Sequence, residues 1–289
     1  MQAEGRSYWN RKLYGTPRGT EADDTVGRDD VSNSCIDGAL SQEEQPFLTI
    51  TRLRLGVPLH HMANLFSISV PTTWRVFASW INLLLFFDLG SLNYWLPKEK
   101  LQETMPDSFK KFPSTGVILN ATEFKVQSPS SLLRQSQVFS QCKSTTTAKA
   151  LVGIAPSGSV TFVSQLYTGG ISDEITKQSK VLTLLERGDN VMADRGFVIE
   201  DLLQPLGCTL NIPPFLNNQG QFSEDQVKQT QEIAIARIHV ERAISRIKLF
   251  KILQNVFPIS QTGLLNQIWT VCALLVNFQS PIIAQDTFV

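Results

Sequence analysis

The spacing of apolar residues changes near Gly116, and this change limits the folds open to the chain. Over residues 46–100, apolar residues recur at the three-to-four-residue spacing typical of helices. After Gly116 they form short runs bounded by turn residues, which is typical of strands. Val117–Phe124 predicts a first strand. Residues 146–167 predict a β-hairpin, because the turn residues Pro156–Gly158 lie at their centre.

Strands and helices alternate in the following part of the chain. The predicted elements are a helix over 172–188 with Ser172 as N-cap and Gly188 as its end, a strand at 190–197, a helix at 198–207 and a strand at 209–215. A long helix is predicted to begin near Glu224, and an amphipathic helix over 262–278 closes the chain. The sequence therefore predicts an α/β fold with a mixed sheet and helices on both faces, the element order that an RNase H-like fold requires.

The chain before Gly116 divides into two regions. Residues 1–45 hold nine acidic and five basic residues and little apolar surface. Such a segment cannot offset the entropy of ordering, so a disordered acidic tail is predicted. Residues 46–100 have helical spacing and predict a small all-α region. A third unit, residues 116–280, then holds the predicted sheet.

The all-α region has the pattern of a helix-turn-helix. Three helices are predicted, and Ser69 and Pro71 are suited to the N-cap and first turn of the third. This arrangement would place Thr72, Thr73 and Arg75 in the major groove of DNA. The alternative is a small helical bundle that only packs on the rest of the protein.

Composition gives weaker constraints. The net charge is zero and hydrophobic residues make up 42% of 289 residues, which allows a substantial core but argues against a uniformly basic DNA-coating protein. Residues 227–251 hold six Lys or Arg against two Glu. This excess of positive charge indicates either a nucleic-acid contact or a solvated helix face. The four cysteines indicate neither a disulfide framework nor a zinc site. No membrane span or signal peptide is expected, so we expect an intracellular protein.

Two carboxylates have positions suited to catalysis. Asp194 follows the apolar run at 191–193, which predicts a buried strand ending in a turn. Glu241 lies within the long predicted helix. A strand-end carboxylate and a helix carboxylate can converge on divalent cations, which is a common way to build a phosphoryl-transfer centre. Spacing alone also allows an exposed strand-end Asp and a solvated helix Glu.

Long composite motifs give the chain a specific resemblance. They include YTGGISDEIT, GDNVMADRGF, TLNIPPFLN and IAIARIHVERAISRIKLFKIL, together with upstream VILNATEF and LRLGVPLHHMANLFSISVPTTWRVFASWI. In this order they resemble the DDE superfamily endonucleases, the transposase domains of the Harbinger kind, with their upstream helix-turn-helix. The resemblance covers most of the chain.

The resemblance implies a catalytic triad that binds divalent metal, Mg²⁺ or Mn²⁺, for phosphodiester cleavage and strand transfer. Its second Asp falls on Asp194 and its Glu on Glu241, with 46 residues between them. The first Asp falls on Asn120, in ILNATEF. An amide supplies a neutral carbonyl oxygen but no charge, so two-metal chemistry is in doubt. Glu123 should point to the opposite face of the strand and is a poor substitute.

Further side chains are expected around this site. Asp173 is a candidate additional metal ligand, or an acidic first-turn residue that complements a helix dipole. Arg195, Arg237 and Lys248 are expected as phosphate contacts, or as salt-bridge partners of the acidic pocket.

Two functions are therefore consistent with the sequence. The first is a metal-dependent DNA endonuclease or transposase-derived protein whose catalysis is impaired by Asn120. The second is a domesticated or decayed transposase that acts as a non-catalytic DNA-binding or protein-interaction module. The resemblance implies a nuclear location and DNA as partner. A separate DNA-binding protein and a second copy of the chain are further partners to consider.

Overall fold

The computed structural model describes residues 40–85, 95–171, 174–214 and 223–283. Most of the predicted acidic tail therefore lies outside the described residues. The first described helix, α2, begins at Glu44, within the stretch assigned to that tail.

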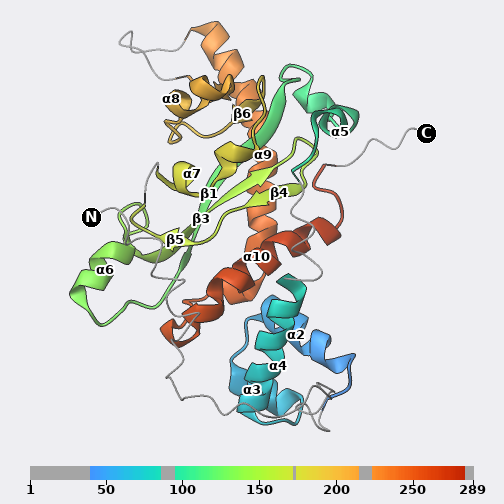
Figure 1. Ribbon diagram of the computed structural model, residues 1–289, viewed down its shortest axis with the longest axis vertical. Coiled ribbons are helices and arrows are strands. Elements are labelled where there is room, and N and C mark those ends of the chain that lie inside the picture. Colours follow the sequence, from blue (N-terminus) through green and yellow to red (C-terminus); the bar gives the residue numbers. More distant parts are fainter. Residues whose placement is uncertain (1–39, 86–94, 172–173, 215–222, 284–289) are drawn as a thin grey trace, which may run out of the picture.

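Three helices form an N-terminal unit: α2 Glu44–Leu55, α3 Leu59–Leu65 and α4 Val70–Leu83 (Figure 1). The hydroxyl of Ser69 accepts a hydrogen bond from the Thr72 N–H at 3.2 Å, and Pro71 lies in the first turn of α4. This confirms the predicted cap, which satisfies a donor that the start of a helix leaves unpaired.

A mixed sheet forms the centre of the larger unit. Its strands are β1 Thr115–Lys125, β2 Phe139–Ser140, β3 Thr145–Ile154, β4 Val160–Val163, β5 Tyr167–Thr168, β6 Asn190–Met192 and β7 Thr209–Asn211. The order is β2-β3-β1-β6-β7, and both β4 and β5 pair with β3. Strands β1, β3 and β4 are antiparallel, whereas β1, β6 and β7 are parallel. This is the predicted RNase H-like α/β arrangement.

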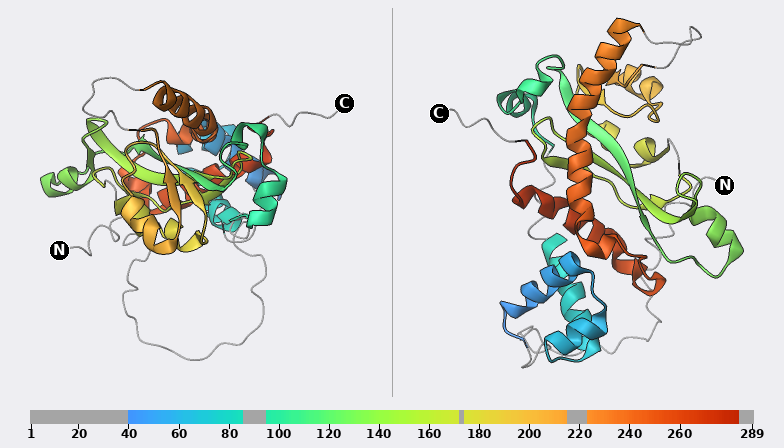
Figure 2. Two further views of the ribbon diagram at one scale, coloured as in Figure 1. Left: turned by 90° about the horizontal axis from the view of Figure 1, so that it is seen from above. Right: turned by 180° about the vertical axis from the view of Figure 1, so that it is seen from behind.

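Helices cover both faces of the sheet, as predicted (Figures 1 and 2). On one face, α9 Glu224–Lys248 and α10 Leu265–Leu275 pack against β1 and β3 and bury a first core. On the other face, α7 Glu174–Gln178 and α8 Glu200–Leu203 help to enclose a second core.

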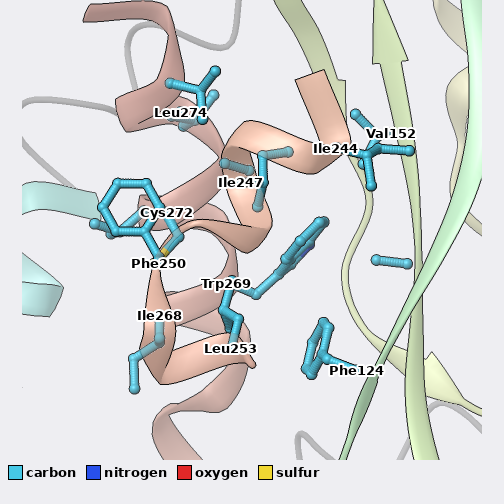
Figure 3. Close-up of a cluster of buried hydrophobic side chains, with 14 of the residues drawn as sticks. Phe124, Val152, Ile244, Ile247, Phe250, Leu253, Ile268, Trp269, Cys272 and Leu274 are labelled. Atoms are coloured by element: carbon cyan, nitrogen blue, oxygen red, sulfur yellow. The ribbon is translucent and has the colours of Figure 1, made fainter. Parts of the chain in front are cut away.

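Trp269 on α10 lies at the centre of the first core (Figure 3). Its ring packs against Phe124 of β1 with centroids 5.6 Å apart, and its indole N–H donates to the Ser164 carbonyl at 3.1 Å. The same core continues through α10 to Phe77 of α4 in the N-terminal unit. The N-terminal unit is therefore packed on the sheet domain through shared apolar residues.

The predicted helix over 172–188 is interrupted, so this prediction is wrong. Helix α7 ends at Gln178, Lys180 adopts a left-handed φ of 63°, and a 3-10 helix follows at Val181–Leu184. Both Ile175 and Val181 are buried in the second core. In a continuous helix, residues six apart point in different directions, so the break allows both side chains to face the sheet. The proposed N-cap, Ser172, lies outside the described residues.

Other elements also differ in length from their predictions. Strand β6 ends at Met192 and β7 at Asn211, and two short helices were not predicted, α5 Lys98–Glu103 and α6 Leu132–Val138. The closing segment contains α10 between two 3-10 turns. Within it, Ile259–Phe278 is long and apolar enough to cross a membrane, and 56% of its most apolar window is buried inside the protein. Burial in the first core accounts for this composition.

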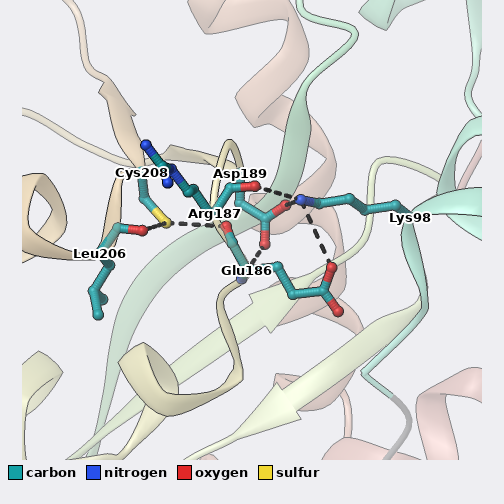
Figure 4. A network of polar contacts seen from close by, with 6 residues as sticks. All are labelled: Lys98, Glu186, Arg187, Asp189, Leu206 and Cys208. Carbon is teal, nitrogen blue, oxygen red and sulfur yellow. Dashed lines mark hydrogen bonds and ion pairs between the residues drawn. The ribbon is translucent and has the colours of Figure 1, made fainter.

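A polar network fixes the start of β6 against α5 (Figure 4). The side chain of Asp189 is only 5% exposed, and its carboxylate accepts the Glu186 N–H at 2.7 Å. Lys98 forms ion pairs with Asp189 at 3.2 Å and Glu186 at 3.7 Å, and it donates to the Arg187 carbonyl at 2.8 Å. The Cys208 thiol lies 3.2 Å from the Glu186 carbonyl oxygen. The buried carboxylate therefore organises the turn that precedes β6.

Replacing Asp189 by Asn should lower the free energy of unfolding by about 1–3 kcal/mol, because a buried acceptor loses its charge-assisted contacts. Chemical denaturation measures this difference. The control is Lys110→Gln, which breaks an exposed pair with Asp107 and should change stability by less than about 0.5 kcal/mol. Equal effects of the two substitutions would contradict the role assigned to Asp189.

His239 on α9 is a buried titratable group. Its ring packs against Phe109 with centroids 6.1 Å apart, and its Nδ1 atom has no hydrogen-bond partner among the described residues. Burial lowers the pKa of His239 below its ordinary value, and the nearby charge of Arg242 lowers this pKa further. The folded protein therefore favours the neutral imidazole.

This lowered pKa predicts that the protein loses stability as the pH falls below about 6.5, where the unfolded chain binds the proton first. Above that pH the contribution of His239 is fully present. Thermal denaturation between neutral and mildly acidic pH should show the decline, and His239→Gln should reduce it. Substitution of the exposed His61 by Gln is the control. A decline that is identical in the His239 variant would rule out this residue as the source.

Candidate active site

Asn120 lies on the face of β1 that is turned toward α9. It pairs with Val152 of β3, and Val152 belongs to the first core together with Ile118 and Phe124, which share the alternation of Asn120 along β1. Its side chain is half-buried. The amide of Asn120 is therefore held on the same side of the sheet as the long helix.

Glu123 points to the opposite face, as predicted. It forms an ion pair with Lys149 at 3.3 Å and accepts a hydrogen bond from the Thr147 hydroxyl at 2.7 Å. Both partners are on β3. Because its carboxylate is engaged on the far face, Glu123 does not replace the charge that is missing at Asn120.

Asp194 lies two residues beyond the end of β6, on the same side of the sheet as Asn120. The parallel register pairs Ile118 of β1 with Met192 of β6, and both belong to the first core. Asn120 and Asp194 each follow this pair by two residues. Asp194, just past the end of β6, therefore lies level with Asn120 of β1, and neighbouring strands are about 4.8 Å apart in a sheet.

Helix α9 brings Arg237 to Asp194. The helix begins with a capping box in which Ser223 and Gln226 bond reciprocally, and it continues without interruption to Lys248. The Arg237 guanidinium lies 3.2 Å from the Asp194 carboxylate. Of the two readings of Arg237 that the sequence allowed, the structure shows the salt bridge to an acidic residue.

Glu241 follows Arg237 by one turn of α9, a rise of about 6 Å. It is exposed, and the described part of the chain offers it no ion pair. The contact between Arg237 and Asp194 places this helix on the same side of the sheet as Asp194. The close convergence of Asn120, Asp194 and Glu241 on one metal stays a prediction.

The charges around Asp194 do not fit a two-metal centre. Asn120 is neutral, and Asp194 is already paired with Arg237, whose side chain is only 10% exposed. Within the described ranges, no group of three His, Cys, Asp or Glu side chains could hold a metal ion. Asp173, the candidate additional ligand, lies outside the described residues. The donor set thus has less negative charge than two adjacent divalent ions require.

The expected nucleic-acid contacts are located in different places. Arg195 directly follows Asp194, and its backbone N–H donates to the Asp194 carboxylate at 2.8 Å. Lys248 is exposed at the C-terminal end of α9, about 17 Å along the helix from Arg237. It therefore lies outside the immediate surroundings of Asp194.

In the N-terminal unit, one predicted DNA contact is wrong. Thr73 is fully buried, and its hydroxyl donates to the Ser69 carbonyl at 3.0 Å, because this position of α4 faces the core beside Phe77. Thr72 and Arg75 remain accessible. The hydroxyl of Thr72 lies 2.8 Å from that of Ser69, and Arg75 is exposed one turn further along α4.

Comparison with known protein families agrees with this architecture. Residues 119–277 match the DDE superfamily endonuclease family, and residues 38–85 match the helix-turn-helix of DDE superfamily endonucleases. The first match covers more than half of the chain; it begins within β1 and ends just beyond α10. The chain therefore belongs to the DDE superfamily endonucleases. A comparison with curated proteins gives no match.

Family membership confirms the predicted class of protein: a transposase-derived nuclease domain preceded by a DNA-binding helix-turn-helix. Endonucleases of this superfamily generally depend on divalent metal ions. Sequence reasoning placed Arg237 near Asp194 but did not choose between its two roles, because the choice depends on how closely α9 approaches the end of β6.

The Arg237–Asp194 pair predicts a specific effect on metal binding. Substitution of Arg237 by Gln removes the cation beside Asp194, so Mn²⁺ should bind about 2- to 10-fold more tightly, as expected for a half-exposed ion pair. Electron paramagnetic resonance of free Mn²⁺ measures this affinity. Arg242→Gln, on an exposed position of the same helix, is the charge-matched control. Equal affinities for the two variants would show that Arg237 does not oppose metal binding.

Proposed function

We propose that this chain is a transposase-derived DNA-binding protein whose endonuclease centre is impaired. The observation that carries the proposal is the set of side chains around Asp194, in which an amide stands where the family has its first Asp and an arginine neutralises the second. The helix-turn-helix supplies the DNA-binding part of the proposal, through the accessible side chains of Thr72 and Arg75.

Electrostatics gives the size of the impairment. Two unit charges about 4 Å apart interact by roughly 4 kcal/mol at the effective dielectric constant of a protein surface. The loss of one carboxylate charge beside divalent ions therefore corresponds to a reduction of several hundred-fold or more in their occupancy or in the rate that depends on them. The positive charge of Arg237 acts in the same direction.

The other side chains around Asp194 have roles that do not require full endonuclease activity. Asp194 and Glu241 are the two carboxylates able to contribute to a single weak metal site. Arg237 holds Asp194 in place through its ion pair, and Arg195 is next to it. We derive no reaction step through a pair of metal ions, since this donor set does not fit them.

A second candidate function follows from the same amide. If restoring an aspartate at Asn120 does not restore cleavage, the protein acts as a non-catalytic DNA-binding or protein-interaction module. Because DNA binding is the main proposal, we also propose a nuclear location for the protein. A separate DNA-binding partner and self-association belong to this proposal in the same way.

Nicking of supercoiled plasmid with Mg²⁺ or Mn²⁺ tests the proposal. The unaltered chain should give little cleavage, whereas Asn120→Asp should restore metal-dependent nicking by roughly 10²-fold or more, because it returns the missing charge. The double variant Asn120→Asp with Glu241→Gln is the control and should be inactive.

Two other results have distinct meanings. Robust cleavage by the unaltered chain that Glu241→Gln abolishes would refute impairment by Asn120. A folded Asn120→Asp variant that still fails to cleave would favour the non-catalytic module.

A further inference from the structure

Four cations gather where the N-terminal unit meets the end of α9. Arg54 lies at the end of α2, Lys248 at the end of α9, Lys251 in the 3-10 turn Lys251–Leu253, and Lys143 between β2 and β3. All four side chains are exposed. We call them the junction cations.

Two contacts bring the end of α2 close to residues 248–251. The Arg54 guanidinium lies 5.9 Å from the centre of the Phe250 ring, between Lys248 and Lys251 in sequence. A Cβ atom on Gly56 would come within 2.7 Å of the Lys251 backbone, so the two segments touch directly. Burial lowers the pKa of Lys248, and the nearby charge of Lys143 lowers this pKa further. The fold thus brings like charges from three separate segments, the end of α2, the β2–β3 connection and residues 248–251, to one surface.

No acidic side chain neutralises this surface in the described part of the chain. Ion pairs there involve Lys98, Lys110, Lys111, Lys149 and Arg237, and none involves a junction cation. Residues 45–87 and 242–285 contain no Asp or Glu at all. Glu123 is the carboxylate whose charge reaches Lys248, and its ion pair is with Lys149. Uncompensated cations on a shared surface are what a polyanion binds.

The junction cations have a fixed position between two DNA-related parts of the protein. Lys248 follows Glu241 by seven residues, so both lie on one face of α9, about 10 Å apart along its axis. On the side of the N-terminal unit, Arg52 is buried and fixes the position of that unit. Its guanidinium donates to the Val57 carbonyl at 2.7 Å and to the Gln261 side chain at 3.0 Å, and it lies 4.8 Å from the centre of the Phe77 ring. Figure 2 shows α9 running across the sheet toward this unit.

We propose that Arg54, Lys143, Lys248 and Lys251 bind the phosphate backbone of double-stranded DNA between the helix-turn-helix and the candidate active site. This inference rests on the proposed DNA-binding function and assigns it a surface. Lysine side chains suit such a role, because their flexible point charges contact phosphates without reading bases. The surface makes a sequence-independent contribution, and it sets the path of the duplex past Glu241.

The test compares two triple variants of equal net charge. One carries Lys143→Gln, Lys248→Gln and Lys251→Gln. The control carries Lys177→Gln, Lys180→Gln and Lys228→Gln, which are also exposed but lie at α7 and at the start of α9. Fluorescence anisotropy with a labelled duplex of random sequence gives the affinity at several salt concentrations, and circular dichroism checks folding.

Each lost phosphate contact should reduce the slope of log affinity against log salt by about 0.9. The slope for the junction variant should therefore fall by about 2–3, whereas the slope for the control variant should change by less than about 0.9. Should the triple variant fold poorly, a double variant of Lys143 and Lys251 replaces it, and this variant should lose about 2 from the slope. Equal slopes for the junction and control variants would overturn the proposal.

Other outcomes separate this surface from the proposed function. If the unaltered chain binds DNA and the junction substitutions leave this binding unchanged, the role assigned to the junction cations is wrong and the proposed function stands. Absence of DNA binding by the unaltered chain overturns both. If single-stranded RNA binding depends on the junction cations and duplex binding does not, the assignment to double-stranded DNA is wrong.

Discussion

The packing of α9 and α10 across the sheet is the constraint on which the other features depend. Trp269 fills the space between α10 and β1, where it contacts Phe124 and donates to the Ser164 carbonyl. This packing sets the height of α9 above β6 and therefore the distance between Arg237 and Asp194. The same core extends to Phe77, so it also fixes the helix-turn-helix relative to the sheet.

Around Asp194 the protein keeps the framework of a nuclease centre while its charge has changed. A centre that holds two divalent ions needs closely spaced negative charge, and apposed carboxylates tolerate one another only when cations are bound. The neutral amide of Asn120 and the ion pair between Arg237 and Asp194 do not meet this requirement.

The rigid connection between units gives such a protein a defined geometry on DNA. Arg52 is buried against the Gln261 side chain and the Phe77 ring, which resists movement of the helix-turn-helix on the sheet domain. Burial lowers the pKa of Arg52 to about 10, so its charge is retained at neutral pH. A duplex bound at α4 would then meet the remaining surface at one fixed angle instead of through a flexible linker.

The sequence by itself determined the family, the order of the main strands with the long helix that follows them, and the cap at Ser69. These features depend on local spacing, turn residues and long motifs, all of which are visible along the chain. It also identified Asn120 as the departure from the family and placed Glu123 on the opposite face, because alternation along a strand has a period of two.

Only the tertiary structure decided how the side chains of distant segments combine. Thr73 proved buried because its side of α4 packs on Phe77, and the helix predicted after residue 172 breaks so that both Ile175 and Val181 reach the second core. The pairing of Arg237 with Asp194 and the gathering of the junction cations likewise join residues far apart in sequence. Such contacts depend on how helices pack against the sheet, and local sequence patterns do not specify that distance or angle.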